Sequence, residues 1–248
     1  MKPSHSWTAR IERAEQLQEE HEAAAELLGF YASLLRLQQS IYQDMISTGQ
    51  AEIAHLAHYA PSLLHLVETS APQAMAELAH GLHQTKWETV LATQWGAQRN
   101  NQTVTADFFV YALLQPYAEI LSRDTPSVDG PRCPYCNSLP HLAVMRPEGD
   151  GARRFLYCGF CAAEWGFRRL KCVNCGEEDK ERLPSFKSGK FEHIYLAGCE
   201  NCHTTLKCID LGVDGHAVPA VDDIASVSLS LWAHEEGYRP VSPNLFGF

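Results

Sequence analysis

Apolar residues recur at helical spacing through the first half of the chain. One stretch places them at steps of three and four, as on one face of a helix: Phe30, Leu34, Leu37, Ile41 and Met45. Residues 51–67 and 71–95 repeat this pattern, and Pro61 is expected to begin a new turn or to kink the helix. Thr105 is expected to cap a final helix. The pattern predicts an all-α helical domain over residues 1–126.

The hydrophobic pattern changes after residues 122–134, which are rich in turn formers. From residue 133 to about 212 the apolar runs are short, β-like and punctuated by glycine, and three of them have the length of a strand: 155–157, 191–195 and 206–209. Helical spacing then returns, with Asp222 or Asp223 able to cap a helix that Gly237 would end. The chain is therefore expected to be an α+β protein of several domains.

The cysteines lie only in the β-like part, and eight of the nine form pairs with two residues between the partners: Cys133/Cys136, Cys158/Cys161, Cys172/Cys175 and Cys199/Cys202. Such a spacing lets a tight turn direct both sulfurs at one ion, and a tetrahedral metal needs two such turns. The intervals between pairs are 21, 10 and 23 residues, and each long interval accommodates a β-hairpin. We therefore predict two four-cysteine modules over residues 127–171 and 172–214, followed by a C-terminal helix and tail over 215–248.

The residue after each second cysteine also indicates a turn. Asn137, Gly176 and His203 are types that tolerate or favour positive φ, whereas Ala162 fits less well. Zinc and iron both suit a tetrahedron of four cysteine sulfurs, and chemistry alone favours zinc over iron. A site whose four positions are all filled by protein is structural or transfers electrons, so no enzymatic activity is expected.

Other interpretations of the cysteines and histidines are weaker. A thioredoxin-like redox pair needs a βαβ context, and c-type haem attachment at the CENCH sequence that starts at Cys199 would leave Cys172 and Cys175 without a role. The unpaired Cys208 is expected to be a small buried residue. Several histidines at helical spacing have no carboxylate at motif spacing and are expected to be surface or core residues: His55, His58, His65, His80 and His83.

The formal net charge of −10 argues against a general nucleic-acid binder, because phosphate affinity needs clustered Lys and Arg. One basic cluster stands out, and it is either a solvated strand face or a docking patch for an acidic partner: Arg153, Arg154, Arg168, Arg169 and Lys171. The first residues lack the apolar core of a secretory signal, and no apolar run approaches 18 residues. A cytoplasmic protein without membrane insertion is expected.

Four sequence blocks follow one another between residues 133 and 238: CPYCNSLP, YCGFCAAEWGFRRLKCVNCG, CENCH and VDDIASVSLSLWAHEEGY. Together they resemble the FdhE family of formate dehydrogenase accessory proteins. The resemblance implies two rubredoxin-like modules on a helical domain, and it shifts the metal preference towards iron, with zinc as the alternative. It also implies a non-enzymatic cytoplasmic protein that binds the catalytic subunit of respiratory formate dehydrogenase before export and serves its assembly or activation.

Two other functions are weighed against this one. A zinc-ribbon adaptor for nucleic acid or transcription would use the arginine cluster, and a free-standing rubredoxin-like electron carrier would need only one metal site. Self-association into a homo-oligomer is left open.

Overall fold

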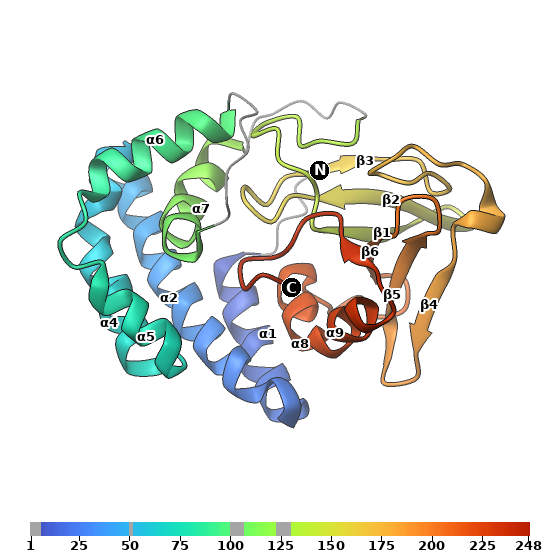
Figure 1. The fold of residues 1–248 in the computed structure, drawn as a ribbon, viewed down its shortest axis with the longest axis horizontal. Helices are drawn as coiled ribbons and strands as arrows, with labels where there is room; N and C mark the ends of the chain where they lie inside the picture. The colour runs from blue at the N-terminus through green and yellow to red at the C-terminus, as the bar shows by residue number, and fades with distance from the viewer. Residues whose placement is uncertain (1–5, 50–51, 100–106, 123–129) are drawn as a thin grey trace.

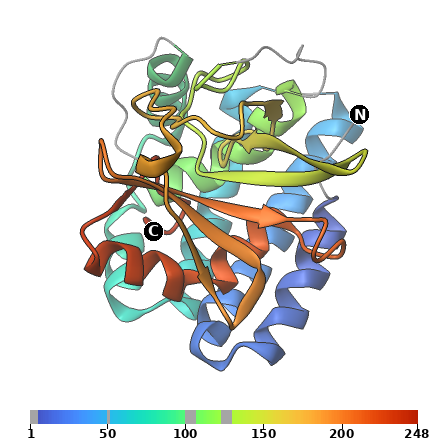
Figure 2. The same cartoon turned by 90° about the vertical axis from the view of Figure 1, so that its right-hand side faces the viewer.

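The computed structural model describes residues 6–49, 52–99, 107–122 and 130–248. Helices from the first half of the chain gather on one side of the molecule, and a twisted sheet from the second half forms the other side (Figure 1). Viewed from the sheet side, the strands lie in front of the helices (Figure 2). This arrangement confirms the predicted α+β class with an N-terminal helical region.

The described part of the helical half is built from these elements: α1 (Trp7–Glu20), η1 (Glu22–Ala24), α2 (Ala25–Thr48), α3 (Ile53–Leu56), η2 (Ala57–Tyr59), α4 (Ala60–Ser70), α5 (Gln73–Gly81), α6 (Trp87–Arg99) and α7 (Phe108–Ser122). Pro61 lies in the first turn of α4, where the missing N–H breaks no helical hydrogen bond. Asp107 caps α7, because its Oδ1 accepts a hydrogen bond from the Phe109 amide at 2.9 Å. Thr105, which we expected to be the cap, lies outside the described residues.

One mixed sheet runs through the whole cysteine-rich region. Its strands are β1 (Leu142–Glu148), β2 (Gly151–Tyr157), β3 (Glu164–Gly166), β4 (Ser185–Ser188), β5 (Phe191–Cys199), β6 (Thr204–Asp210) and β7 (Arg239–Pro240). The order is β3-β2-β1-β6-β5-β4, with β7 beside β6. The three strand-sized segments predicted from the sequence lie in β2, β5 and β6.

The parallel pairing of β1 with β6 joins the two halves of the sheet. Antiparallel pairing builds each half, β1 with β2 and β3 on one side and β6 with β5 and β4 on the other. The two expected four-cysteine modules therefore share one hydrogen-bonded sheet. Their separation into domains at residue 171 remains a prediction.

The C-terminal segment forms two helices, α8 (Pro219–Ala225) and α9 (Val227–Glu235), where the sequence predicted one. The break falls at Ser226, whose hydroxyl donates to the Asp222 carbonyl at 2.7 Å and whose backbone leaves the helical region. Gly237 ends α9 with φ +85°, as expected. A further 3-10 helix, η3 (Lys180–Arg182), precedes β4.

Buried ion pairs tie the helical half to the sheet half. Arg13 of α1 contacts Asp222 at 2.7 and 3.1 Å, and Nε2 of His193 on β5 lies 2.8 Å from the same carboxylate. Lys207 of β6 pairs with Asp223 at 2.8 Å. Both aspartates are almost fully buried. Burial of an ion is costly unless it is paired. Asp222 therefore anchors α1 of the helical half to α8 and β5, whereas Asp223 anchors α8 to β6 within the second half of the chain.

Candidate metal centres

The first cluster brings together the four cysteine sulfurs that the sequence assigned to one module. Cys133 Sγ lies 3.5 Å from Cys161 Sγ, and Cys136 Sγ lies 3.4 Å from Cys158 Sγ and 3.7 Å from Cys161 Sγ. All four side chains are buried. The pairing of the first pair with the second is the one that the interval lengths predicted.

The second cluster is built in the same way from the other two pairs. Cys172 Sγ lies 3.7 Å from Cys202 Sγ, and Cys175 Sγ lies 3.6 Å from Cys199 Sγ. In contrast to the first cluster, Cys175 is exposed and Cys202 is half-buried. One cluster is therefore enclosed by protein, and the other reaches the surface.

Four tight turns aim the sulfurs inward. The residues after the second cysteines all have positive φ: Asn137 at 61°, Ala162 at 55°, Gly176 at 79° and His203 at 51°. In each turn the amide of that residue donates to the carbonyl of the first cysteine, at 2.8 to 3.1 Å. The expected turns are confirmed, including the one at Ala162, where a residue with a Cβ holds a left-handed conformation that costs about 1–2 kcal/mol.

The described distances fit a tetrahedral thiolate-bound metal ion. For metal–sulfur bonds of about 2.3 Å, a tetrahedron places sulfurs about 3.8 Å apart. In each cluster the four sulfurs lie within 4.8 Å of one another, and the contacts above come close to the tetrahedral edge. Two ions could therefore be held, one by each cluster, and both zinc and iron fit this donor set.

The thiol pKa values of the first cluster indicate which cysteines ionise before a metal ion binds. Hydrogen bonds from Cys133, Cys158 and Cys161 lower the pKa of Cys136 far below its usual range. Burial raises the pKa of Cys158 and of Cys161. Without a cation, the enclosed site therefore favours the Cys136 thiolate and opposes ionisation of Cys158 and Cys161, so a metal must displace the protons of these two thiols as it binds.

The second cluster has a more polar surrounding. Burial raises the pKa of the Cys202 thiol, but its hydrogen bonds, led by the one with Thr204 Oγ1 at 3.1 Å, bring the value down to about 6. Asn201 Nδ2 lies 3.5 Å from Cys175 Sγ and can donate to it. Donors of this kind offset the charge of thiolate ligands at the edge of the protein.

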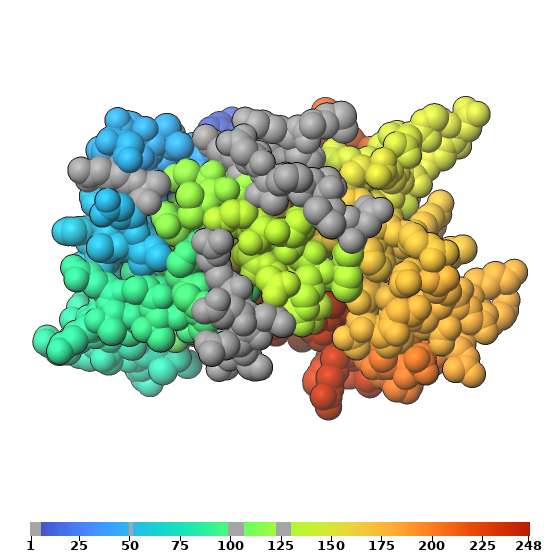
Figure 3. All heavy atoms as spheres, turned by 90° about the horizontal axis from the view of Figure 1, so that it is seen from above, coloured from blue at the N-terminus to red at the C-terminus, as the bar shows by residue number. Residues whose placement is uncertain are grey.

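Helices α6 and α7 brace the first cluster through side chains that sequence reasoning missed. Gln98 Nε2 donates to Ser138 Oγ at 2.6 Å, Gln115 Nε2 donates to the Gly159 carbonyl at 2.7 Å, and Ser122 Oγ donates to the Cys161 carbonyl at 2.8 Å. In the space-filling view, the segment that carries the first cysteine pair lies between the helical half and the sheet half (Figure 3). The cluster is thus part of the joint between them.

Aromatic packing closes the same joint. Phe160, inside the second CxxC turn, packs its ring 4.7 Å from that of Tyr111 and 5.9 Å from that of Trp95, measured between centroids. The Phe160 side chain is 4% exposed. No spacing rule links these residues, because they are 49 and 65 positions apart along the chain.

The arginine cluster has a different organisation from the surface patch that the sequence suggested. Arg154 is buried, and its Nη1 donates to the carbonyls of Arg169 and Lys171, each at 3.2 Å. Arg153 is exposed and pairs with Glu148, while Arg168 pairs with Glu178 at 2.8 Å. Arg154 therefore holds a loop in place, and a partner-binding role for the exposed arginines remains a prediction.

Cys208 lies buried on β6, as expected for a small core residue, and burial raises the pKa of its thiol. His83 Nε2 lies 2.8 Å from Glu68 Oε1, and His80 Nδ1 lies 3.5 Å from the same atom. The carboxylate comes from α4, His80 from the end of α5 and His83 from the turn after it, which is why motif spacing did not reveal the group. These three residues could hold an ion, but both histidines are exposed.

The fold and the clusters define a class of protein: a helical domain joined to a sheet that carries two candidate metal sites of four cysteines each. No described helix combines the length and apolar character needed to cross a membrane. Two family models match consecutive segments, "FdhE, central domain" over residues 132–169 and "FdhE, C-terminal domain" over 170–246. A protein of Aquifex aeolicus named "Protein FdhE homolog" is 33% identical over 198 residues, covering 78% of this chain and 70% of its own. The chain belongs to the FdhE family.

Two further comparisons extend over nearly the whole chain. A "Protein FdhE homolog" of Pectobacterium atrosepticum is 26% identical, covering 98% of this chain and 87% of its own. The crystal structure of the FdhE protein from Pseudomonas aeruginosa superposes with a TM-score of 0.72 over 96% of this chain and 94% of that one, at 24% identity. The shared fold therefore includes the helical half, which the two family models do not cover.

Proposed function

We propose that this protein is a cytoplasmic accessory factor of respiratory formate dehydrogenase that binds the catalytic subunit during its assembly or activation. The observation that carries the proposal is membership in the FdhE family together with two complete four-cysteine clusters. The resemblance of the cysteine blocks implies this partner.

The closed ligand sets support a non-enzymatic role. A hydrolytic metal site keeps one coordination position open for water, whereas each cluster here offers four cysteine sulfurs. The first cluster is enclosed within the joint between the two halves, where a bound ion would hold that joint together. The second cluster reaches the surface beside Cys175 and is the one that a partner could contact.

The resemblance favours iron in both clusters, with zinc as the alternative. Iron bound by four thiolates supplies one-electron redox chemistry, whereas zinc supplies structure alone. The exposure of Cys175 favours a second candidate function, electron transfer, because exchange of electrons with a partner needs a site near the surface. A visible absorption spectrum that bleaches on reduction would support this second function, and a colourless zinc-loaded protein would exclude it.

Co-purification tests the proposed partner. The tagged chain is expressed in a host that produces respiratory formate dehydrogenase, and the bound fraction is probed for the catalytic subunit. We expect the intact chain to retain the subunit, and a variant with Cys133→Ala and Cys172→Ala to lose both metal and subunit. Cys208→Ala is the matched control, since this cysteine lies outside both clusters. Equal recovery of the subunit with the intact chain and with an untagged control would refute the proposal.

A further inference from the structure

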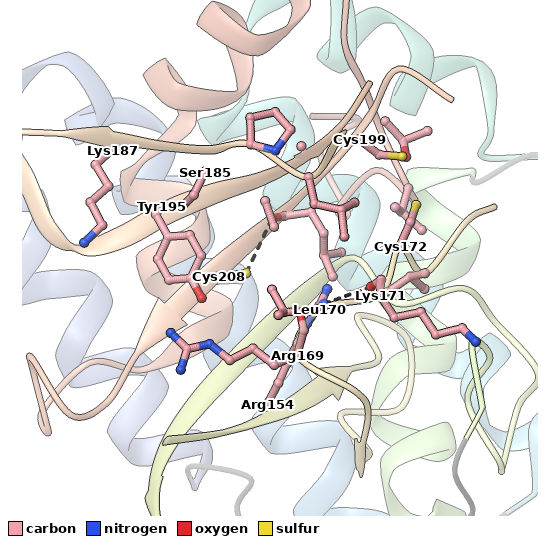
Figure 4. Close-up of a pocket in the computed structure, with 18 of the residues that line it drawn as sticks. Arg154, Arg169, Leu170, Lys171, Cys172, Ser185, Lys187, Tyr195, Cys199 and Cys208 are labelled. Atoms are coloured by element: carbon pink, nitrogen blue, oxygen red, sulfur yellow. Dashed lines mark hydrogen bonds between the residues drawn. The ribbon is translucent and has the colours of Figure 1, made fainter. Parts of the chain in front are cut away.

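A cavity of about 240 Å³ opens beside the second cluster, between the β4–β5 hairpin and the loop that follows β3. Cys172 and Cys199 contribute to its wall, so its contents would lie next to that cluster. In the close-up, the Tyr195 ring and the Arg169 guanidinium extend towards each other, Arg154 lies to one side of them, and Lys187 lies at the outer edge of the cavity (Figure 4). Cationic side chains from segments that are distant in the sequence thus line the same cavity.

Two of these cations have no carboxylate partner in the described part of the chain. Arg169 and Lys187 line the cavity and make no ion pair with any described residue, whereas Lys171 at the same wall pairs with Glu178 at 2.9 Å. Asp210 is the one acidic side chain among the described lining residues, and its Oδ1 accepts a hydrogen bond from the Gly212 amide at 2.9 Å. Basic side chains therefore outnumber carboxylates in the lining, and the other source of negative charge there is the metal cluster, whose Cys172 and Cys199 form one end of the wall.

Arg154 adds an unused donor deep in the wall. Its Nη1 is engaged with backbone carbonyls, but its Nε is buried and has no hydrogen-bond partner among the described residues. A buried N–H without an acceptor is costly and rare in folded proteins. The Nε atom itself is enclosed by protein, so the charge of the guanidinium, and not a direct Nε contact, would act on an anion in the cavity, and guanidinium groups pair favourably with oxyanions.

We propose that this cavity binds an oxyanion, a carboxylate or phosphate group, held by Arg169 and Lys187 with Arg154 at the base. Pockets for drug-sized ligands span about 300–1,000 Å³, so a cavity of 240 Å³ suits a small anion or one acidic side chain of a peptide. Arg169 belongs to the predicted basic patch, but Lys187 does not, because β4 was not predicted from the sequence. The proposal is independent of the proposed partner, since it concerns a ligand chemistry and no particular protein.

Titration calorimetry on the full, metal-loaded chain at low ionic strength tests this site. The probes are inorganic phosphate, citrate and a capped hexaglutamate peptide, so that a free small anion and an acidic peptide are distinguished. Arg169→Gln and Lys187→Gln are each expected to weaken binding at least about fivefold, as loss of a charge-assisted contact does. Arg153→Gln is the matched control, because Arg153 is exposed on β2 and is not part of the cavity.

Every outcome of the titrations either supports or refutes the oxyanion site. Binding of phosphate or citrate that both cavity variants weaken supports the site with a small-molecule ligand, and the same pattern seen for hexaglutamate alone supports it with a peptide ligand. Binding to the intact chain should also weaken as salt is added, because exposed charges are screened. The proposal is overturned if no probe binds with a Kd below about 1 mM, or if the cavity variants bind as well as the Arg153→Gln control.

Discussion

The two clusters are expected to release their metal ions at very different rates. The four cysteines of the first cluster are at most 2% exposed, whereas Cys175 of the second cluster is at the surface. A chelator can attack the second cluster in the folded protein. It can reach the first cluster only after the turns that carry its cysteines have separated from α6 and α7.

The cost of that opening can be worked from the contacts in the joint. Separation breaks the hydrogen bonds made by Gln98, Gln115 and Ser122, each worth about 0.5–1.5 kcal/mol net. It also exposes Phe160, whose burial is worth about 1.5–3 kcal/mol. The total is about 3–7 kcal/mol, so release from the first cluster should be slower by a factor of at least about 100.

A zinc-loaded chain mixed with a chromogenic chelator gives the measurement. We expect two phases of equal amplitude, a fast one from the second cluster and a slow one from the first. Phe160→Ala should accelerate the slow phase at least about tenfold and leave the fast phase unchanged. Phe155→Ala, in a half-buried phenylalanine of β2, is the control that should change neither phase. A single phase, or acceleration of both phases by Phe160→Ala, would refute the role assigned to the joint.

Three further predictions concern stability, each measured by denaturant unfolding of the metal-loaded chain. Ala162→Gly should raise the free energy of unfolding by about 1 kcal/mol, because it relieves a positive φ of 55°; a decrease would contradict this. Asp222→Asn should lower it by about 3 kcal/mol at pH 7, since it removes the buried carboxylate partner of Arg13 and leaves that guanidinium only the half-buried Asp214 at 3.1 Å. Burial acts to raise the pKa of Asp222, but hydrogen bonds from His193 and Arg13 and the charge of Arg13 lower it below the usual 3.8. This stabilisation is therefore present above pH 3.8 and is lost as the pH falls further. The variant should show a shallower acid loss in that window, and an unchanged acid profile would be inconsistent with the pairing. Arg154→Ala should lower the unfolding free energy by about 2 kcal/mol and Arg153→Ala by less than about 0.5, and equal effects would argue against the loop-holding role of Arg154.

Local features of the fold and of the clusters could be predicted from the sequence. A CxxC pair and the residue after it form one turn, so five consecutive residues are enough to predict the turn and its two sulfur ligands. This is why the four turns and the assignment of pairs to clusters follow from spacing. The helical half could also be predicted from the sequence, because apolar residues on a buried helix face such as that of α2 recur every three to four positions.

Long-range features could not be predicted in the same way. Nothing local marks β1 and β6 as parallel neighbours, because 55 residues separate the two strands and pairing depends on the assembled sheet. Arg153 and Arg154 are adjacent and identical in type, and strand alternation places one outside and the other inside. The sequence shows that the two must face opposite sides, but only the packed structure shows which side is buried.

We propose above that this chain serves respiratory formate dehydrogenase through its cysteine clusters. The most direct test is formate-dependent dye reduction by a strain whose gene for this chain has been deleted. We expect the deletion to abolish this activity and the intact chain to restore it. A chain with Cys133→Ala and Cys172→Ala, produced at the same level, should not restore it. Full formate dehydrogenase activity in the strain that carries only the double variant would contradict the proposed role of the cysteine clusters.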